Sequence, residues 1–156
     1  MRLLGRWGKL GKGTTMKTPL HLWIVGVLSL LWNAFGAYNH VMTQFRNAQY
    51  LSVFTPEQMA YFDNAPVWFD AVWATGVWFS VLGAILLLLR SRLARSAFGV
   101  SLLGLAASPV YSFGLAEPST IDMMGSFALV FTGVIVVILV ALWLCARAMV
   151  TRGVLR

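Results

Sequence analysis

The sequence predicts an all-α integral membrane protein, a bundle of four transmembrane helices with both termini in the cytoplasm. Hydrophobic residues make up 59% of the 156-residue chain, charged residues make up only 11%, and four long stretches carry no charge. Soluble domains contain about 25% charged residues. A chain of this length cannot hide so many apolar side chains in one water-soluble core, so a lipid bilayer is the expected environment.

Flanking charges delimit the spans. The uncharged stretches cover residues 18–45, 71–89, 96–116 and 123–146, and about 20 apolar residues cross the hydrocarbon of a bilayer. The membrane domain is therefore predicted over residues 18–148, between a basic arm over 1–17 and a cytoplasmic tail over 149–156. Within this domain, the predicted spans are about 20–42, 67–89, 97–115 and 123–146.

The arm mixes basic residues with Leu and Trp at near-helical spacing. This composition is typical of a segment that lies on a membrane surface, where Trp and Leu enter the interface and the cations approach anionic headgroups. Lipid contacts are expected from Arg2, Arg6, Trp7, Lys9 and Lys12. The alternative is that this segment is a flexible tail. The native start codon can be that of Met1 or that of Met16.

The first span carries a polar face. Gly26, Ser29, Asn33, Gly36 and His40 recur at intervals of three and four residues, which places them along one side of a helix. Polar groups that face lipid are costly, so this side is expected to point inward.

The loop after the first span is too aromatic for a freely solvated connection, and a short interfacial helix is predicted from Pro56 to about Phe62. Thr55 is a suitable N-cap residue, Pro56 fits the first helical position, and Gln58 can complete a capping box.

Two features of the second half concern helix packing and the membrane surface. Gly104, Ser108 and Ser112 recur every four residues, a ridge that lets another helix approach closely; Gly36 is expected to serve the same purpose in the first span. Arg90, Arg92 and Arg95 separate the second and third spans and are expected to meet lipid headgroups. Ser119 is predicted to cap the fourth span, with Asp122 three residues later.

Basic residues predict the orientation. Five Lys or Arg lie in the arm, three between the second and third spans and three at the C-terminal end, so Arg46 is the only one of the twelve elsewhere. Cytoplasmic loops are enriched in Lys and Arg, which places both termini in the cytoplasm. All five acidic residues fall on the opposite side.

Six polar residues in or beside the spans are candidates for an outward-facing cavity: Asn33, Asn39, His40, Asp70, Tyr111 and Ser112. The helical rise places Asn33 level with Tyr111, and His40 level with Asp70. A His40–Asp70 pair would titrate and suit proton-linked uptake or ligand capture. In the alternative, Asn33 and Tyr111 are interhelical hydrogen-bonding residues, and His40 and Asp70 lie at the wet interface without a partner.

Several function classes are disfavoured. No nucleophile elbow, His-Glu-x-x-His zinc motif or cysteine pair is present, so an enzyme is not expected. No cofactor is predicted, since His40 lacks a second ligand at helical spacing for a metal or a chlorin. The basic residues lie beside apolar spans, which indicates membrane topology rather than nucleic-acid binding. The expected partners are the lipid bilayer and other membrane protein subunits.

Five short segments support a family resemblance: Leu31–Asn33, Met42–Gln44, Phe54–Gln58, Trp68–Trp73 and Leu87–Arg92. Through them the chain resembles a family of small, uncharacterised four-helix inner-membrane proteins of proteobacteria, some loosely labelled sugar transporters. The likeness covers about Lys17 to Arg92 well and the second half only by pattern. It implies the fold and a location in the bacterial inner (cytoplasmic) membrane, and no activity.

The contact features exceed what an isolated helical bundle needs. Trp68, Trp73 and Trp78 fan around the second span, and the Gly/Ser ridge, aromatic loop and basic arm add further surface. We therefore expect a non-enzymatic accessory or structural subunit of a larger membrane complex, of respiratory or photosynthetic type. The alternative is a small-solute transporter or ligand-binding membrane protein that uses the outward-facing polar cavity.

Overall fold

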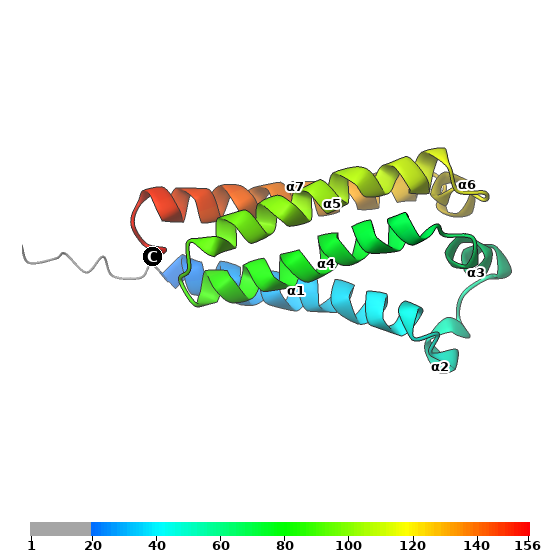
Figure 1. Ribbon diagram of the computed structural model, residues 1–156, viewed down its shortest axis with the longest axis horizontal. Helices are drawn as coiled ribbons and strands as arrows, with labels where there is room; N and C mark the ends of the chain where they lie inside the picture. Colours follow the sequence, from blue (N-terminus) through cyan, green and yellow to red (C-terminus); the bar gives the residue numbers. More distant parts are fainter. Residues whose placement is uncertain (1–19) are drawn as a thin grey trace, which may run out of the picture.

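The computed structural model describes residues 20–156, so the predicted arm lies outside the described residues. Four helices are long and apolar enough to cross a membrane: α1 (Leu20–Gln44), α4 (Val67–Leu88), α5 (Leu93–Gly114) and α7 (Ser126–Thr151). They run along the long axis of the molecule (Figure 1). The prediction of an all-helical chain with four candidate membrane spans is confirmed.

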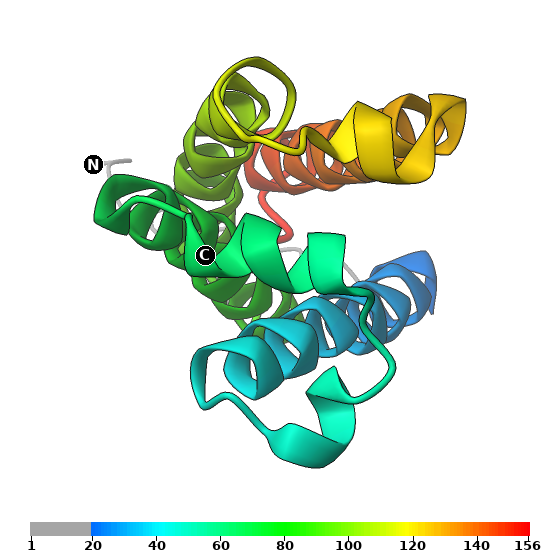
Figure 2. The ribbon, with the colours of Figure 1, turned by 90° about the vertical axis from the view of Figure 1, so that its right-hand side faces the viewer.

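Three short helices lie at the same end of the molecule, where α1 ends and α7 begins (Figure 1). They are α2 (Ala48–Leu51), α3 (Pro56–Asp63) and α6 (Thr120–Met124). The sequence signal for α3 is confirmed, because the Thr55 hydroxyl accepts from the Gln58 amide and the Gln58 side chain accepts from the Thr55 amide. Figure 2 shows α3 lying across this end of the long helices. We call it the capped end.

Ser119 caps a different helix from the one predicted. Its hydroxyl accepts from the Asp122 amide and the Asp122 carboxylate accepts from the Ser119 amide, but this capping box starts α6 rather than the fourth span. Gly125 then adopts φ 58° and ψ −148°, a conformation that favours glycine and breaks the helix. α7 therefore begins at Ser126, three residues later than the predicted span.

The long helices pack in the order α1, α4, α5, α7, and α1 and α7 do not form a packed pair. Figure 2, which looks onto the capped end, shows α1 and α7 well separated there. At the capped end, α1 and α7 therefore do not close the bundle against each other.

α4 and α5 make the closest crossing. A Cβ atom on Gly104 would lie 2.7 Å from the amide nitrogen of Gly76 and 2.9 Å from the carbonyl oxygen of Val72. The hydroxyl of Ser101 donates to the Gly76 carbonyl at 2.6 Å. Small residues on both helices thus allow the two backbones to touch and to exchange a hydrogen bond within the apolar interior.

The opposite end, where α7 ends and α4 turns into α5, is closed by an apolar core that includes Leu22, Leu87 and Phe98. Val154 and Leu155, two residues of the predicted tail, are buried in this core. α7 also extends into the predicted tail, as far as Thr151. The Arg92 amide donates to the Arg156 carbonyl at 3.0 Å, and the Arg156 amide donates to the Arg90 carbonyl at 2.8 Å. We call this the basic end.

Candidate functional site

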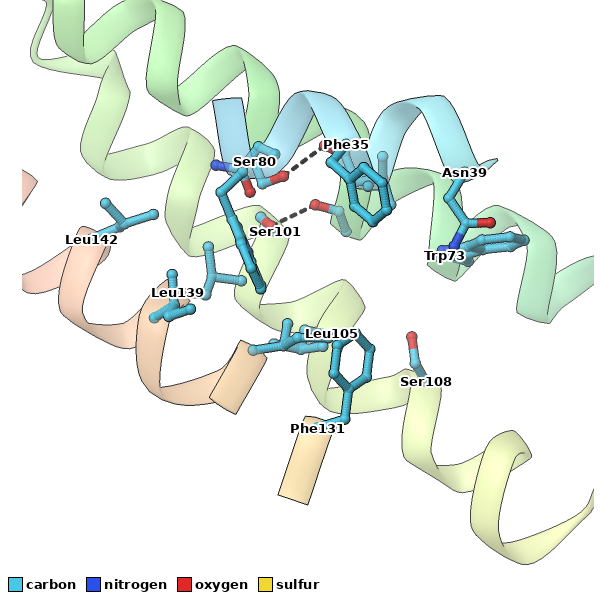
Figure 3. Close-up of a pocket in the computed structure, with 17 residues that line it drawn as sticks. Phe35, Asn39, Trp73, Ser80, Ser101, Leu105, Ser108, Phe131, Leu139 and Leu142 are labelled. Atoms are coloured by element: carbon cyan, nitrogen blue, oxygen red, sulfur yellow. Dashed lines mark hydrogen bonds between the residues drawn. The ribbon is translucent and has the colours of Figure 1, made fainter. Parts of the chain in front are cut away.

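A groove lies between α1 and α7, over α4 and α5 (Figure 3). Its volume is about 360 Å³, and α4 and α5 form its floor. Phe35 of α1 and Phe131 of α7 come from opposite walls, and Leu139 and Leu142 lie toward the closed end. On α7 the lining extends from Phe131 to Leu142, a length of about 16 Å along a helix. The groove therefore follows the open side of the bundle.

Two amides supply polarity at the groove. The Nδ2 group of Asn33, a residue with 8% of its surface exposed, donates to the Ser29 hydroxyl at 3.2 Å. The Oδ1 atom of Asn39 accepts from the Tyr50 hydroxyl at 2.9 Å. Within residues 20–156, Asn33 Oδ1 and Asn39 Nδ2 have no hydrogen-bond partner, and neither atom is fully buried. One acceptor and one donor thus remain available at the groove.

The serines of the groove are already satisfied. Ser80 donates to the Val77 carbonyl, Ser101 donates to the Gly76 carbonyl, and Figure 3 shows both bonds. Ser108 donates to the carbonyl of Gly104 at 3.0 Å. All three hydroxyl protons are donated to backbone carbonyls, so the two amides carry most of the groove's capacity to recognise a polar group.

Gly36 leaves part of the α1 wall bare. Beyond its own turns of α1, a Cβ atom placed on Gly36 would meet no atom of residues 20–156 within 4 Å, although Gly36 lines the groove. Of the three residues predicted for helix packing, Gly104 lies at the α4–α5 crossing and Ser108 bonds back to its own helix. At Gly36, by contrast, an added Cβ would touch no other helix among residues 20–156.

His40 and Asp70 do not line the groove. His40, with 8% of its surface exposed, lies with its ring centre 4.7 Å from Trp73 and 6.3 Å from Trp78. Its Nδ1 atom is buried and has no hydrogen-bond partner among residues 20–156. Asp70 instead accepts from the side-chain amide of Gln44 at 3.2 Å. No direct His40–Asp70 hydrogen bond is present, so the two residues are placed in separate contacts.

Tyr111 and Ser112 hold α3 against the long helices. The Tyr111 hydroxyl donates to the Tyr61 carbonyl at 3.2 Å, and the hydroxyls of Tyr61 and Ser112 share a hydrogen bond of 2.8 Å. Tyr111 also lies 4.5 Å from Phe69 between ring centres. Burial raises the pKa of the Tyr61 phenol above its ordinary value. The six predicted cavity residues are thus divided among four places: Asn33 and Asn39 line the groove, His40 lies against Trp73 and Trp78, Asp70 bonds to Gln44, and Tyr111 and Ser112 contact α3.

The structure describes three of the eight residues predicted to contact lipid headgroups. Arg2, Arg6, Trp7, Lys9 and Lys12 lie outside the described residues. Arg90, Arg92 and Arg95 lie at the basic end, where Arg90 has φ 59° and its Nε atom donates to the Val154 carbonyl at 3.4 Å. Arg92 and Arg95 border a second hollow between α5 and α7.

The α7 wall of the groove was not predicted from the sequence. Phe131, Ile135, Ile138 and Leu142 follow helical spacing, but α7 is apolar on every side and its inward face cannot be distinguished by pattern. Within residues 20–156, no three His, Cys, Asp or Glu side chains lie together as metal ligands.

No protein-family model, curated protein or solved structure matches this chain. The resemblance to small proteobacterial inner-membrane proteins therefore stays a prediction.

Proposed function

We propose that the protein is a non-enzymatic accessory or structural subunit of a larger membrane protein complex, and that a transmembrane helix of another subunit occupies the groove between α1 and α7. The groove carries this proposal. It opens sideways between two candidate spanning helices and exposes one amide acceptor, one amide donor and the bare backbone of Gly36. Lipid tails cannot bond to amides, whereas a helix with a polar side chain can, and small residues let helices approach closely.

The orientation with both ends of the membrane domain in the cytoplasm belongs to this proposal. Arg90, Arg92 and Arg95 share one end of the molecule with the C-terminal end of α7, whereas the acidic residues lie at or near the capped end. The positive-inside rule supports a cytoplasmic basic end. A bacterial inner membrane, and a complex of respiratory or photosynthetic type, are the proposed setting.

A pair of glycine substitutions tests the groove. Gly36→Leu fills the groove, whereas Gly133→Leu adds the same side chain on α7 outside it; neither added Cβ meets another atom within 4 Å. Both variants should therefore fold. Purified gently from the native membrane, wild type and Gly133→Leu should retain the same partner protein, and Gly36→Leu should lose it. A photo-crosslinker at Phe35 should attach to that partner.

Two outcomes would overturn the proposal. The first is a wild-type protein that purifies alone, as a 17.2 kDa monomer or a homo-oligomer. The second is equal retention of the partner by Gly36→Leu and Gly133→Leu, which would place the contact elsewhere. Thermal unfolding of both variants in detergent serves as the folding control.

The alternative is a small-solute transporter or ligand-binding membrane protein. The groove volume of about 360 Å³ supports it, because ligand cavities span about 300–1,000 Å³. In this case, Asn39→Leu removes the free amide donor and should abolish binding or uptake of a solute while leaving the fold intact. His40→Ala and Asp70→Asn test the outward cavity in the same assay, and the transporter interpretation fails if all three variants behave as wild type.

A further inference from the structure

The second hollow lies at the basic end, between the start of α5 and the last turns of α7. Its volume is about 520 Å³, and its lining combines charged and apolar residues. Arg92, Arg95 and Ser96 line its outer part, at the start of α5. Gly99 is about 6 Å further along α5 than Arg95, and Trp143 is about 10 Å back along α7 from Val150. The cations therefore lie at the end of the hollow nearest the end of the molecule, beside Leu93 and Val150, and Gly99 and Trp143 lie further along the two helices.

The cations of this hollow have no carboxylate partner within the part of the chain that the structure describes. The ion pair in residues 20–156 joins Arg46 to Asp63, at the capped end. Residues 1–19 contain no Asp or Glu. α5 begins directly after Arg92, so the partial positive charge of its N-terminus adds to the same field.

Trp143 supplies a hydrogen-bond donor inside the hollow. Its indole Nε1 atom would lie 3.5 Å from a Cβ on Gly99, so the N–H edge of the ring lies beside α5. The guanidinium of Arg147 lies 5.7 Å from the Trp143 ring centre, which brings a third cation to the rim. Guanidinium groups bond to phosphate with two parallel N–H donors, and Lys-type point charges do not.

From this arrangement we propose that the hollow binds the headgroup of an anionic phospholipid. The lipid phosphate lies against Arg92 and Arg95, and an acyl chain descends along Gly99, Trp143 and Val150. A free phosphate ion would use only the outer part and leave the apolar wall uncovered. A zwitterionic lipid would fit less well, because its cationic amine would be repelled by the arginines. The inference is independent of the partner proposed for the α1–α7 groove.

The test uses the whole protein in a neutral detergent, with thermal unfolding as the readout. Phosphatidylglycerol should raise the unfolding temperature in a saturable way, while phosphatidylcholine and inorganic phosphate should not. Arg95→Gln should weaken the apparent phosphatidylglycerol affinity about tenfold, the effect of losing one charge-assisted contact. Arg152→Gln removes the same charge at the same end outside the hollow, and should change the affinity less than about twofold.

A second measurement does not depend on the arginine variants. Phosphatidylglycerol with brominated acyl chains should quench tryptophan fluorescence more in wild type than in Trp143→Phe, and brominated phosphatidylcholine should quench the two equally. Equal responses to the two lipids, equal effects of Arg95→Gln and Arg152→Gln, or stabilisation by inorganic phosphate alone would each overturn the proposed lipid site.

Discussion

Replacing Gly104 with alanine tests the α4–α5 crossing. The added Cβ would lie 2.7 Å from the Gly76 nitrogen and 2.9 Å from the Val72 oxygen, both backbone atoms that a side-chain rotation cannot move. The two helices must separate, and overpacking of this kind costs about 1–3 kcal/mol. Separation also strains the Ser101–Gly76 hydrogen bond, which adds about 1 kcal/mol. Against this, alanine gains about 1 kcal/mol over glycine in helix propensity.

The net expectation is a loss of about 1–3 kcal/mol in the free energy of unfolding. Gly133→Ala is the matched control: it makes the same chemical change on α7, where the added Cβ meets nothing within 4 Å. Its free energy of unfolding should stay equal or rise by up to about 1 kcal/mol. Reversible unfolding in mixed micelles with increasing denaturing detergent, followed by circular dichroism, measures both variants. Equal stability of Gly104→Ala and Gly133→Ala would refute the close crossing.

Three further predictions use the same unfolding assay. Tyr61→Phe should lower the free energy of unfolding by about 1 kcal/mol, because it removes the hydroxyl that shares a hydrogen bond with Ser112. Because burial raises the pKa of Tyr61 in the folded state, the wild type should also lose stability as the pH rises above about 10. This loss of stability at high pH should be smaller in Tyr61→Phe. Arg46→Ala should change stability by less than about 1 kcal/mol because the ion pair with Asp63 is exposed, and a larger loss would contradict this. His40→Phe keeps the edge contact with Trp73 and removes a buried nitrogen that has no hydrogen-bond partner among residues 20–156. The free energy of unfolding should therefore stay the same or rise by about 1 kcal/mol. A loss above about 2 kcal/mol would mean that this nitrogen has a hydrogen-bond partner.

Local signals in the sequence predicted local structure. The capping box at Thr55 and Gln58 needs only neighbouring residues, and α3 forms where it indicates. Likewise, the periodic polar face of α1 predicts that Ser29, Asn33 and His40 turn away from lipid, and all three are buried. Both signals depend on contacts within about one helical turn, which the sequence spacing specifies directly.

The candidate site depended on geometry that spacing does not specify. Helical rise gives the height of a residue in the membrane, so Asn33 and Tyr111 were predicted at one level, but rise does not give the direction around the helix axis. Tyr111 in fact points to Tyr61, a residue of the loop helix. The groove was missed for the same reason, because it depends on which helices pair and α7 has no polar face to reveal its contacts.

The open groove and the closed basic end have a common structural cause. Leu155 and Val154 turn back into the core where α4, α5 and α7 meet, and the chain is held there by the two backbone hydrogen bonds of Arg156. Leu22, near the start of α1, joins the same core, so α1 is held near α7 only at the basic end. Toward the capped end α1 follows α4 instead, and the loop with α3 docks on α5 through Tyr61, not on α7. With no bridging contact there, the gap between α1 and α7 remains open along the height of Asn33 and Asn39, the two residues that carry free amide groups.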